Sequence, residues 1–82
     1  MKDEWHYAGR YYLLSQYTDS ESIGWELEDV APTPGRGEVL DAKLHDSDGS
    51  LTLRVWTSDP LPLELVHRFT SEAMEHFSLA SE

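Results

Sequence analysis

Four histidines, at positions 6, 45, 67 and 76, are the side chains best suited to acid–base or metal chemistry. None has the spacing of a metal-binding motif. His67 and His76 are nine residues apart, which at about 100° per residue places them on opposite sides of a helix. Cysteine is absent, so thiolate zinc sites and cysteine nucleophiles are excluded. We therefore predict surface histidines and no metal centre.

The segment Asp46-Ser47-Asp48-Gly49 has the alternating aspartates of a calcium loop. Its glycine comes too early, and the twelfth position from Asp46 is Thr57, where a calcium loop carries a bidentate glutamate. A hairpin turn explains the segment better. A metal-binding or ligand-binding enzyme domain would need chemistry at His45, Asp46 and Asp48. We predict instead that the chain is not an enzyme, with no catalytic residues and no cofactor.

Charge is the most informative global property of the chain. Asp and Glu number 16 against 6 Lys and Arg, for a net charge of −10 on 82 residues. Such a field repels nucleic acid and anionic membranes and attracts basic surfaces, so we expect a basic protein as the partner, with no nucleic acid and no membrane. A disordered acidic tail is disfavoured, because 39% of the residues are hydrophobic and 11% aromatic.

One short motif points to a particular kind of recognition. Glu21-Ser22-Ile23 is followed, after four residues, by Glu28-Asp29-Val30. This arrangement resembles the protein inhibitors of uracil-DNA glycosylase carried by phages and mobile elements. Their signature is a short Glu-Ser-Ile edge strand followed by an acidic pair and a Val on a helix. Size, negative charge and the lack of Cys agree with the resemblance, whereas the C-terminus is predicted as a helix where that family continues its sheet.

The resemblance implies an inhibitor that mimics DNA, blocks the basic groove of the glycosylase and sequesters its apolar wedge. A duplex carries one charge per about 1.7 Å, so ten excess charges match roughly 17 Å of DNA. The implied partner-binding residues are Glu21, Ser22, Ile23, Glu28 and Asp29. The implied hydrophobic pocket is lined by Trp25, Val30, Leu53 and Val55.

Two further interpretations stay open. The same residues can form a solvated loop, a charge at a helix N-terminus and an ordinary core. Within binding proteins, the alternative is a small acidic immunity or anti-defence protein that caps another basic partner, such as a nuclease toxin. Acidic charge and small size suit both inhibitors, and the spacing of Glu21-Ser22-Ile23 favours the glycosylase inhibitor.

The elements that must position these residues fit in one domain, 1–82, because a chain of this length has room for a single core. No apolar run is long enough to span a membrane, and the Met1 to Glu4 start lacks the character of a secretory signal. We expect a cytoplasmic protein.

The pattern predicts an α+β fold with an N-terminal helix, an antiparallel β-sheet with a central hairpin, and a C-terminal helix. Tyr7, Tyr11 and Leu14 share one helical face, which favours a helix over 3–17, although Gly9 and the pair Tyr11-Tyr12 favour a strand. A short strand at 23–25 and a second short helix or turn at 27–31 follow, ended by Pro32 and a loop over 32–37.

The most secure elements come last in the chain. Residues 38–45 and 51–57 alternate between apolar and polar side chains, and the polar segment 46–50 between them predicts a hairpin. Residues 59–78 predict a helix, because Asp59 can cap it, Pro60 suits its first position, and apolar side chains recur from Leu65 to Phe77 at spacing four. The competing possibility is a strand over 63–69, or 61–69 at its widest.

Overall fold

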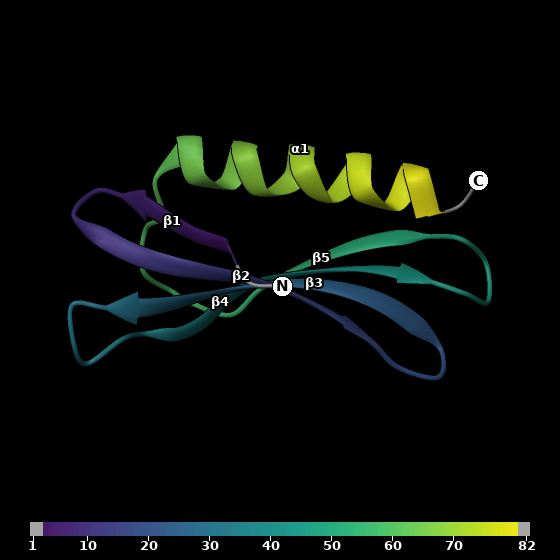
Figure 1. Cartoon of the computed structure of the whole chain (residues 1–82), viewed down its shortest axis with the longest axis horizontal. Helices are drawn as coiled ribbons and strands as arrows, with labels where there is room; N and C mark the ends of the chain where they lie inside the picture. Colours follow the sequence, from purple (N-terminus) through teal and green to yellow (C-terminus); the bar gives the residue numbers. More distant parts are fainter. Residues whose placement is uncertain (1–2, 81–82) are drawn as a thin grey trace.

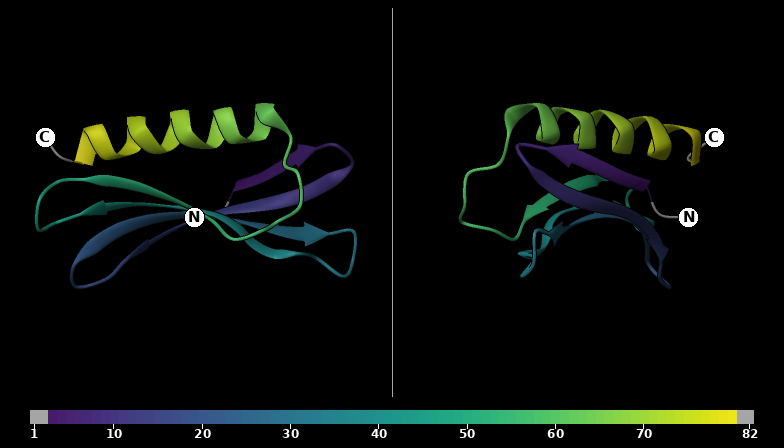
Figure 2. Two further views of the ribbon diagram at one scale, coloured as in Figure 1. Left: turned by 180° about the vertical axis from the view of Figure 1, so that it is seen from behind. Right: turned by 60° about the vertical axis from the view of Figure 1, so that its left-hand side comes forward.

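The structure is a computed structural model that describes residues 3–80. Its strands are β1 (Asp3–Tyr7), β2 (Arg10–Thr18), β3 (Ser22–Ala31), β4 (Gly37–His45) and β5 (Leu51–Val55). They form one antiparallel sheet in chain order, β1-β2-β3-β4-β5. The described residues contain one helix, α1 (Leu63–Ala80), which lies along one face of this twisted sheet (Figure 1). Two further views show the other face without a covering element from residues 3–80 (Figure 2). The α+β class is therefore confirmed.

The expected N-terminal helix is wrong, because the described part of that region is the hairpin β1–β2. Ala8 and Gly9 form its turn with φ of 52° and 75°, and positive φ at both central residues is typical of a type I′ turn. Trp5 pairs with Tyr12 across the hairpin, and each is only 1% exposed. Large aromatic side chains suit the half-buried surface of a sheet, where they pack against cross-strand neighbours, so sheet pairing prevails over helical spacing.

The second short helix or turn expected at 27–31 is also wrong. Residues 22 to 31 form one continuous strand, β3, which includes the short strand expected at 23–25. β3 pairs with β2 on one side and β4 on the other. The physical reason is an alternation of period two, in which Trp25 and Leu27 face the core while Glu26 and Glu28 face away from it.

The central hairpin is confirmed as β4–β5. The N–H of His45 donates to the carbonyl of Ser50 at 3.0 Å, and Gly49 takes a φ of 71° in the turn. Where Leu27 pairs with Leu40 and Glu28 with Glu38, Val39 is an extra residue in β4. This bulge lets both Val39 and Leu40 be fully buried.

The C-terminal helix is confirmed, but it begins at Leu63 and not at residue 59. The carbonyl of Pro62 accepts the first bonds of the helix, from the N–H groups of Leu65 at 3.1 Å and Val66 at 3.2 Å. Pro60 and Pro62 disfavour helical dihedrals in the residues before them, so the helix starts only after the second proline. The strand considered over 63–69 is not observed.

The core lies between α1 and the facing side of the sheet. Its fully buried apolar side chains include Trp5, Tyr12, Leu27, Val39, Leu40, Leu65 and Phe69. The apolar stripe of α1, predicted from spacing four, supplies Leu65, Phe69, Ala73 and Phe77. Within residues 3–80 there is no helix with the length and apolar character needed to cross a membrane.

Candidate protein-binding face

The tripeptide Glu21-Ser22-Ile23 lies at the turn between β2 and β3. Asp19 holds this turn: its Oδ1 accepts from the N–H groups of Glu21 at 2.9 Å and Ser22 at 2.8 Å, and from the Ser22 hydroxyl at 3.0 Å. These hydrogen bonds, first that from the Glu21 N–H, lower the pKa of Asp19. Ser22 is buried and Ile23 packs partly against the core, while Glu21 remains exposed. Ser22 and Asp19 thus shape the turn.

The tripeptide does not form an edge strand, contrary to what the resemblance implies. β3 is the middle strand of the sheet, and its pairs with β2 and β4 both include Ile23. Its backbone groups are therefore taken up by its neighbours and are not available to extend the sheet with a partner strand.

The second half of the motif lies at the other end of the same strand. Six residues of extended chain separate Ser22 from Glu28, a distance of about 20 Å. Glu28 is exposed, but Asp29 points to the side of the sheet that α1 covers and is only 1% exposed. In this conformation Asp29 has no surface to offer to a partner.

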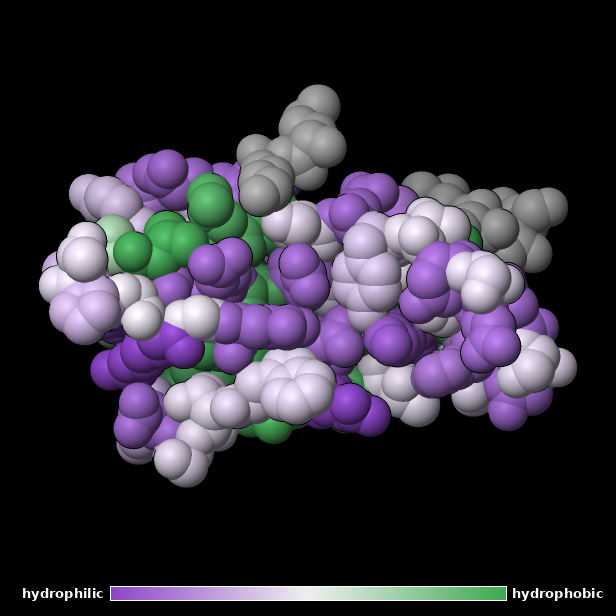
Figure 3. All heavy atoms as spheres, turned by 90° about the horizontal axis from the view of Figure 1, so that it is seen from below, coloured by the Kyte–Doolittle hydropathy of each residue, from purple (hydrophilic) through white to green (hydrophobic). Residues whose placement is uncertain are grey.

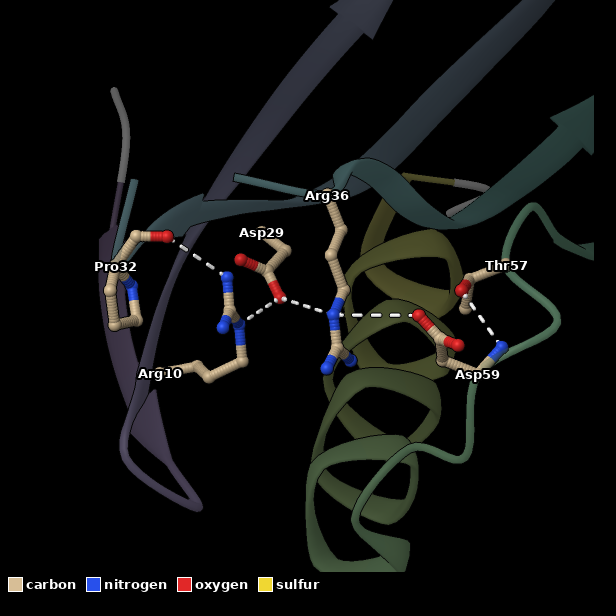
Figure 4. Close-up of polar contacts among 6 residues, drawn as sticks. All are labelled: Arg10, Asp29, Pro32, Arg36, Thr57 and Asp59. Carbon is tan, nitrogen blue, oxygen red and sulfur yellow. Dashed lines mark hydrogen bonds and ion pairs between the residues drawn. The ribbon is translucent and has the colours of Figure 1, made fainter. Parts of the chain in front are cut away.

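Asp29 instead ties together segments that are distant in the chain (Figure 4). Its Oδ2 accepts from Nε of Arg10 in β2 at 2.7 Å and lies 3.9 Å from Nε of Arg36. Arg10 also donates to the carbonyl of Pro32 at 3.1 Å, and Nε of Arg36 lies 3.5 Å from Oδ2 of Asp59, which precedes α1. The hydrogen bond to Asp29 raises the pKa of Arg10. This network joins β2, β3, the loop 32–36 between β3 and β4, and the loop 56–62 between β5 and α1.

The four residues expected to line a hydrophobic pocket are dispersed. The Trp25 ring meets the His76 ring of α1 edge-on, with centroids 4.4 Å apart. Trp25 and His76 line one hollow. Leu53 lines a second hollow, between β5 and α1. Val30 is half-buried and lines neither hollow, and Val55 is exposed near the end of β5. The structure does not bring these side chains together in a single pocket.

The open side of the sheet carries a group of carboxylates that we call the acidic face, composed of Glu26, Glu28, Glu38 and Asp41. The register places them in two cross-strand pairs of like charge, Glu26 opposite Asp41 and Glu28 opposite Glu38. Because side chains alternate along a strand, Glu26 and Glu28 point away from the face that buries Leu27. Figure 3 shows that this side of the molecule is largely hydrophilic.

The carboxylates of the acidic face lie close enough together to affect one another's ionisation. The pKa of Glu38 is raised, first by partial burial and then by Glu26 and Asp41. Tyr17 donates its hydroxyl to Oδ1 of Asp41 at 2.9 Å. The pKa of Tyr17 is raised as well, first by burial and then by this hydrogen bond. Both shifts favour the proton-bearing form, which carries less negative charge.

Two basic side chains, Lys43 and Arg54, line a hollow together with Asp41. Within residues 3–80 none of the four carboxylates of the acidic face takes part in an ion pair. Arg54 is opposite Asp41 in the register, but its guanidinium lies over the Trp56 ring at 5.0 Å. Like charges directly opposite in a sheet are destabilising. The acidic face therefore holds carboxylates that have no ion-pair partner in residues 3–80, and a basic partner would supply cations to them.

A glycine in β3 positions the tyrosine of this face. Tyr17 is opposite Gly24, and its ring lies against the glycine so closely that a Cβ at position 24 would overlap the ring. The ring therefore lies flat on the sheet, with its hydroxyl directed to Asp41.

The acidic face was not predicted from the sequence, because a short helix or turn was expected at 27–31. The alternation Trp25-Glu26-Leu27-Glu28 was the signal that could have revealed it.

The segment Asp46 to Ser50 is the hairpin turn that its composition predicts. Oδ1 of Asp48 accepts from the N–H of Ser50 at 2.9 Å, which lowers the pKa of Asp48. Nε2 of His45 lies 2.9 Å from the Thr52 hydroxyl. In the described part of the chain no group of three or more His, Cys, Asp or Glu side chains is arranged to hold a metal ion.

The geometry thus separates a structural carboxylate, Asp29, from an acidic face on the open side of the sheet, in which Glu28 and Glu38 are exposed and Asp41 is buried. Comparison with protein-family models, curated proteins and solved structures finds no match to this chain.

Proposed function

We propose that this protein is an acidic inhibitor that binds the basic groove of another protein through the acidic face, and that it is not an enzyme. The observation that carries the proposal is the set of like-charge pairs, Glu26 with Asp41 and Glu28 with Glu38, which have no ion-pair partners within residues 3–80. Such an arrangement costs stability in the free protein and becomes favourable only when a basic surface covers it.

The charge density of this face suits mimicry of DNA. Glu26 and Glu28 lie about 6.7 Å apart along one strand, and a paired carboxylate lies opposite each of them. Four charges over that length approach the density of a duplex, about one charge per 1.7 Å. The net charge of −10 adds a long-range field that steers a basic partner toward the molecule.

The first partner to test is uracil-DNA glycosylase, on the grounds of the resemblance carried by Glu21-Ser22-Ile23 and Glu28-Asp29-Val30. In this proposal Glu26, Glu28 and Glu38 contact the basic groove, the buried Asp41 adds its charge from beneath them, Glu21 adds a contact at the far end of β3, and Asp29 supports the sheet from within. Binding of the glycosylase excludes its substrate DNA, while the inhibitor itself contains no uracil to cleave.

The decisive experiment measures cleavage of a uracil-containing oligonucleotide by a bacterial glycosylase, with and without a stoichiometric amount of this protein. We expect inhibition. The variant Glu26→Gln/Glu28→Gln should lose most of it, whereas Glu72→Gln/Glu75→Gln on α1, with the same change of charge, should keep it. Equal losses for the two variants would show that bulk charge, and not the acidic face, drives binding.

The second candidate is an immunity or anti-defence protein that caps a different basic protein, such as a nuclease toxin. Two observations favour it: Ser22 and Ile23 lie in the middle strand of the sheet, and Asp29 is buried. Both weaken the match to the glycosylase inhibitors but leave the acidic face intact. Undiminished uracil cleavage at a large excess of folded protein would select this candidate. Its own test is neutralisation of purified nuclease toxins by the wild-type protein, compared with the same two double variants.

A further inference from the structure

A second surface, on the other side of the molecule, is apolar. β5 is the last strand of the sheet, and Leu51, Leu53 and Val55 point to the side of α1 but remain 46%, 47% and 55% exposed. Met74 of α1 is 61% exposed. A groove of about 290 Å³ runs between the strand and the helix, and both Leu53 and Met74 line it. The helix therefore leaves the apolar side of β5 largely uncovered.

The backbone of β5 also has hydrogen-bonding groups directed away from the sheet. The Ser50 carbonyl accepts from His45 and the Trp56 N–H donates to Val39 at 2.9 Å, so these even-numbered residues face β4. Backbone groups alternate in direction along a strand. The N–H and C=O groups of Leu51, Leu53 and Val55 consequently point outward, where residues 3–80 provide no neighbouring strand.

The two edges of the sheet differ in their protection against pairing with another chain. β1 carries Asp3 and Glu4 on a strand of five residues, and its Trp5 is buried. Residues 51–57 contain no carboxylate, and neither do the helix residues that line the groove. Charged side chains are a usual means of keeping an edge strand unpaired. β5 lacks the negative charge that covers most of this molecule.

We propose that β5 is a dimerisation edge that pairs antiparallel with β5 of a second copy of this chain, about a two-fold axis at Leu53. The inference is independent of the proposed function. With the axis at Leu53, Leu51 lies opposite Val55 of the other copy, and Thr52 lies opposite Arg54 of the other copy. The outward N–H and C=O groups of Leu51, Leu53 and Val55 then bond in pairs, as in any antiparallel ladder.

Charge explains why the occupant is a second copy. Two molecules of net charge −10 repel each other wherever carboxylates meet. β5 itself carries no carboxylate, so two copies can meet along this strand without that repulsion. The register also keeps the two Arg54 side chains from facing each other, since each is opposite a Thr52. Apolar side chains from both copies then form one continuous strip on the α1 side. Both acidic faces stay free on the opposite side of a joined sheet.

Salt concentration distinguishes this contact from binding to a basic partner. Repulsion between the two acidic molecules is screened over a Debye length of about 8 to 10 Å at physiological salt. Dimerisation should therefore strengthen between about 0.05 M and 0.5 M NaCl, whereas binding to a basic protein should weaken over the same range. Sedimentation velocity of the full chain measures the mass directly, and we expect a species of twice 9.4 kDa.

Single cysteines test the register, because the chain contains none of its own. Leu53→Cys places two thiols across the axis with Cα atoms about 5.5 Å apart, within the range of a disulfide. Val55→Cys places them about 13 Å apart, since each is opposite Leu51. Mild oxidation with diamide should cross-link the Leu53→Cys variant and leave Val55→Cys monomeric on a denaturing gel. Equal cross-linking of both variants would overturn the register.

A matched pair of charge variants tests the interface itself. Leu53→Glu brings two carboxylates together at the axis and should weaken dimerisation by about 30-fold or more, the scale of a central interface residue. Thr52→Glu adds the same charge to the same strand, but beside Lys43 of β4 and opposite Arg54 of the other copy, so dimerisation should persist. Melting curves check that both variants fold. Monomeric wild-type protein at both salt concentrations, even at about 100 µM, would overturn the proposal.

Discussion

Replacing Glu38 by Gln tests whether the acidic face costs the free protein stability. Glu38 is opposite Glu28 in the register, and its raised pKa reflects partial burial together with Glu26 and Asp41. Glutamine keeps the shape of the side chain and removes the charge. The expected result is a more stable protein that binds its basic partner less well, because the interaction that destabilises the free state is the one used in binding.

The magnitude follows from the number of like charges around Glu38. A directly opposite pair of like charges in a sheet costs about 0.2 to 1 kcal/mol. Glu38 has one such neighbour and two more nearby, so we expect the free energy of unfolding to rise by about 0.5 to 1 kcal/mol at pH 7.5. For a domain of this size that corresponds to a rise in Tm of about 2 to 8 °C.

The pH dependence gives this prediction a distinctive sign. The pKa of Glu38 in the folded protein is raised above its ordinary value of 4.5, so the folded state holds this proton more tightly than the unfolded state. The repulsion is therefore fully present above the folded pKa, and it disappears as the pH falls below 4.5. The stability gain of Glu38→Gln should be present at pH 7.5 and absent at about pH 3.5.

Thermal unfolding followed by far-UV circular dichroism at the two pH values is the assay. Glu64→Gln is a suitable control, because Glu64 lies in the first turn of α1 and its charge is favourable there. Its loss should lower Tm slightly at pH 7.5, opposite in sign to Glu38→Gln. An unchanged or lower Tm for Glu38→Gln at pH 7.5, or an equal gain at both pH values, would refute the reasoning.

Three further predictions concern the residues that hold the sheet. Asp29→Ala should lower the free energy of unfolding in urea titrations, because it removes the carboxylate that Arg10 and Arg36 share, whereas Glu28→Ala should change it by less than about 0.5 kcal/mol. Gly24→Ala should destabilise the protein by displacing the Tyr17 ring, and a double-mutant cycle with Tyr17→Ala should show most of that loss to be shared. Stability should fall as the pH rises above about 10, because the folded pKa of Tyr17 is raised, and Tyr17→Phe should reduce that fall in alkaline urea titrations.

Local sequence signals predicted the elements whose pattern allows only one structure. Apolar side chains at spacing four from Leu65 to Phe77 identify α1, and two alternating runs around a Gly-containing polar turn identify β4–β5. Each signal involves residues close in the chain, so no distant partner is needed to interpret it. The start of the helix was misplaced by one turn, because the effect of Pro62 on the preceding residues outweighed the capping pattern, and its end lies at Ala80 instead of residue 78.

The first part of the chain was ambiguous, and pairing between strands decided it. Tyr7, Tyr11 and Leu14 fit a helix, but Trp5, Tyr12 and Leu14 fit one face of a sheet. A hairpin with both Ala8 and Gly9 at positive φ settles the choice, and it is stable only because the sheet continues through β3 to β5. β-propensity depends on such neighbours, which sequence reasoning cannot see.

For the candidate site, the sequence by itself determined how much negative charge the protein carries, and hence that a basic partner is expected. It did not determine which carboxylates share a surface. Glu28 and Asp29 are adjacent in the chain but lie on opposite faces of β3, one exposed and one paired with Arg10 beneath the sheet. Glu38 joins Glu28 only through the register of β3 with β4, which includes the bulge at Val39. Side chains alternate in direction and strands pair over long distances in sequence, so only the tertiary structure decides which charges meet.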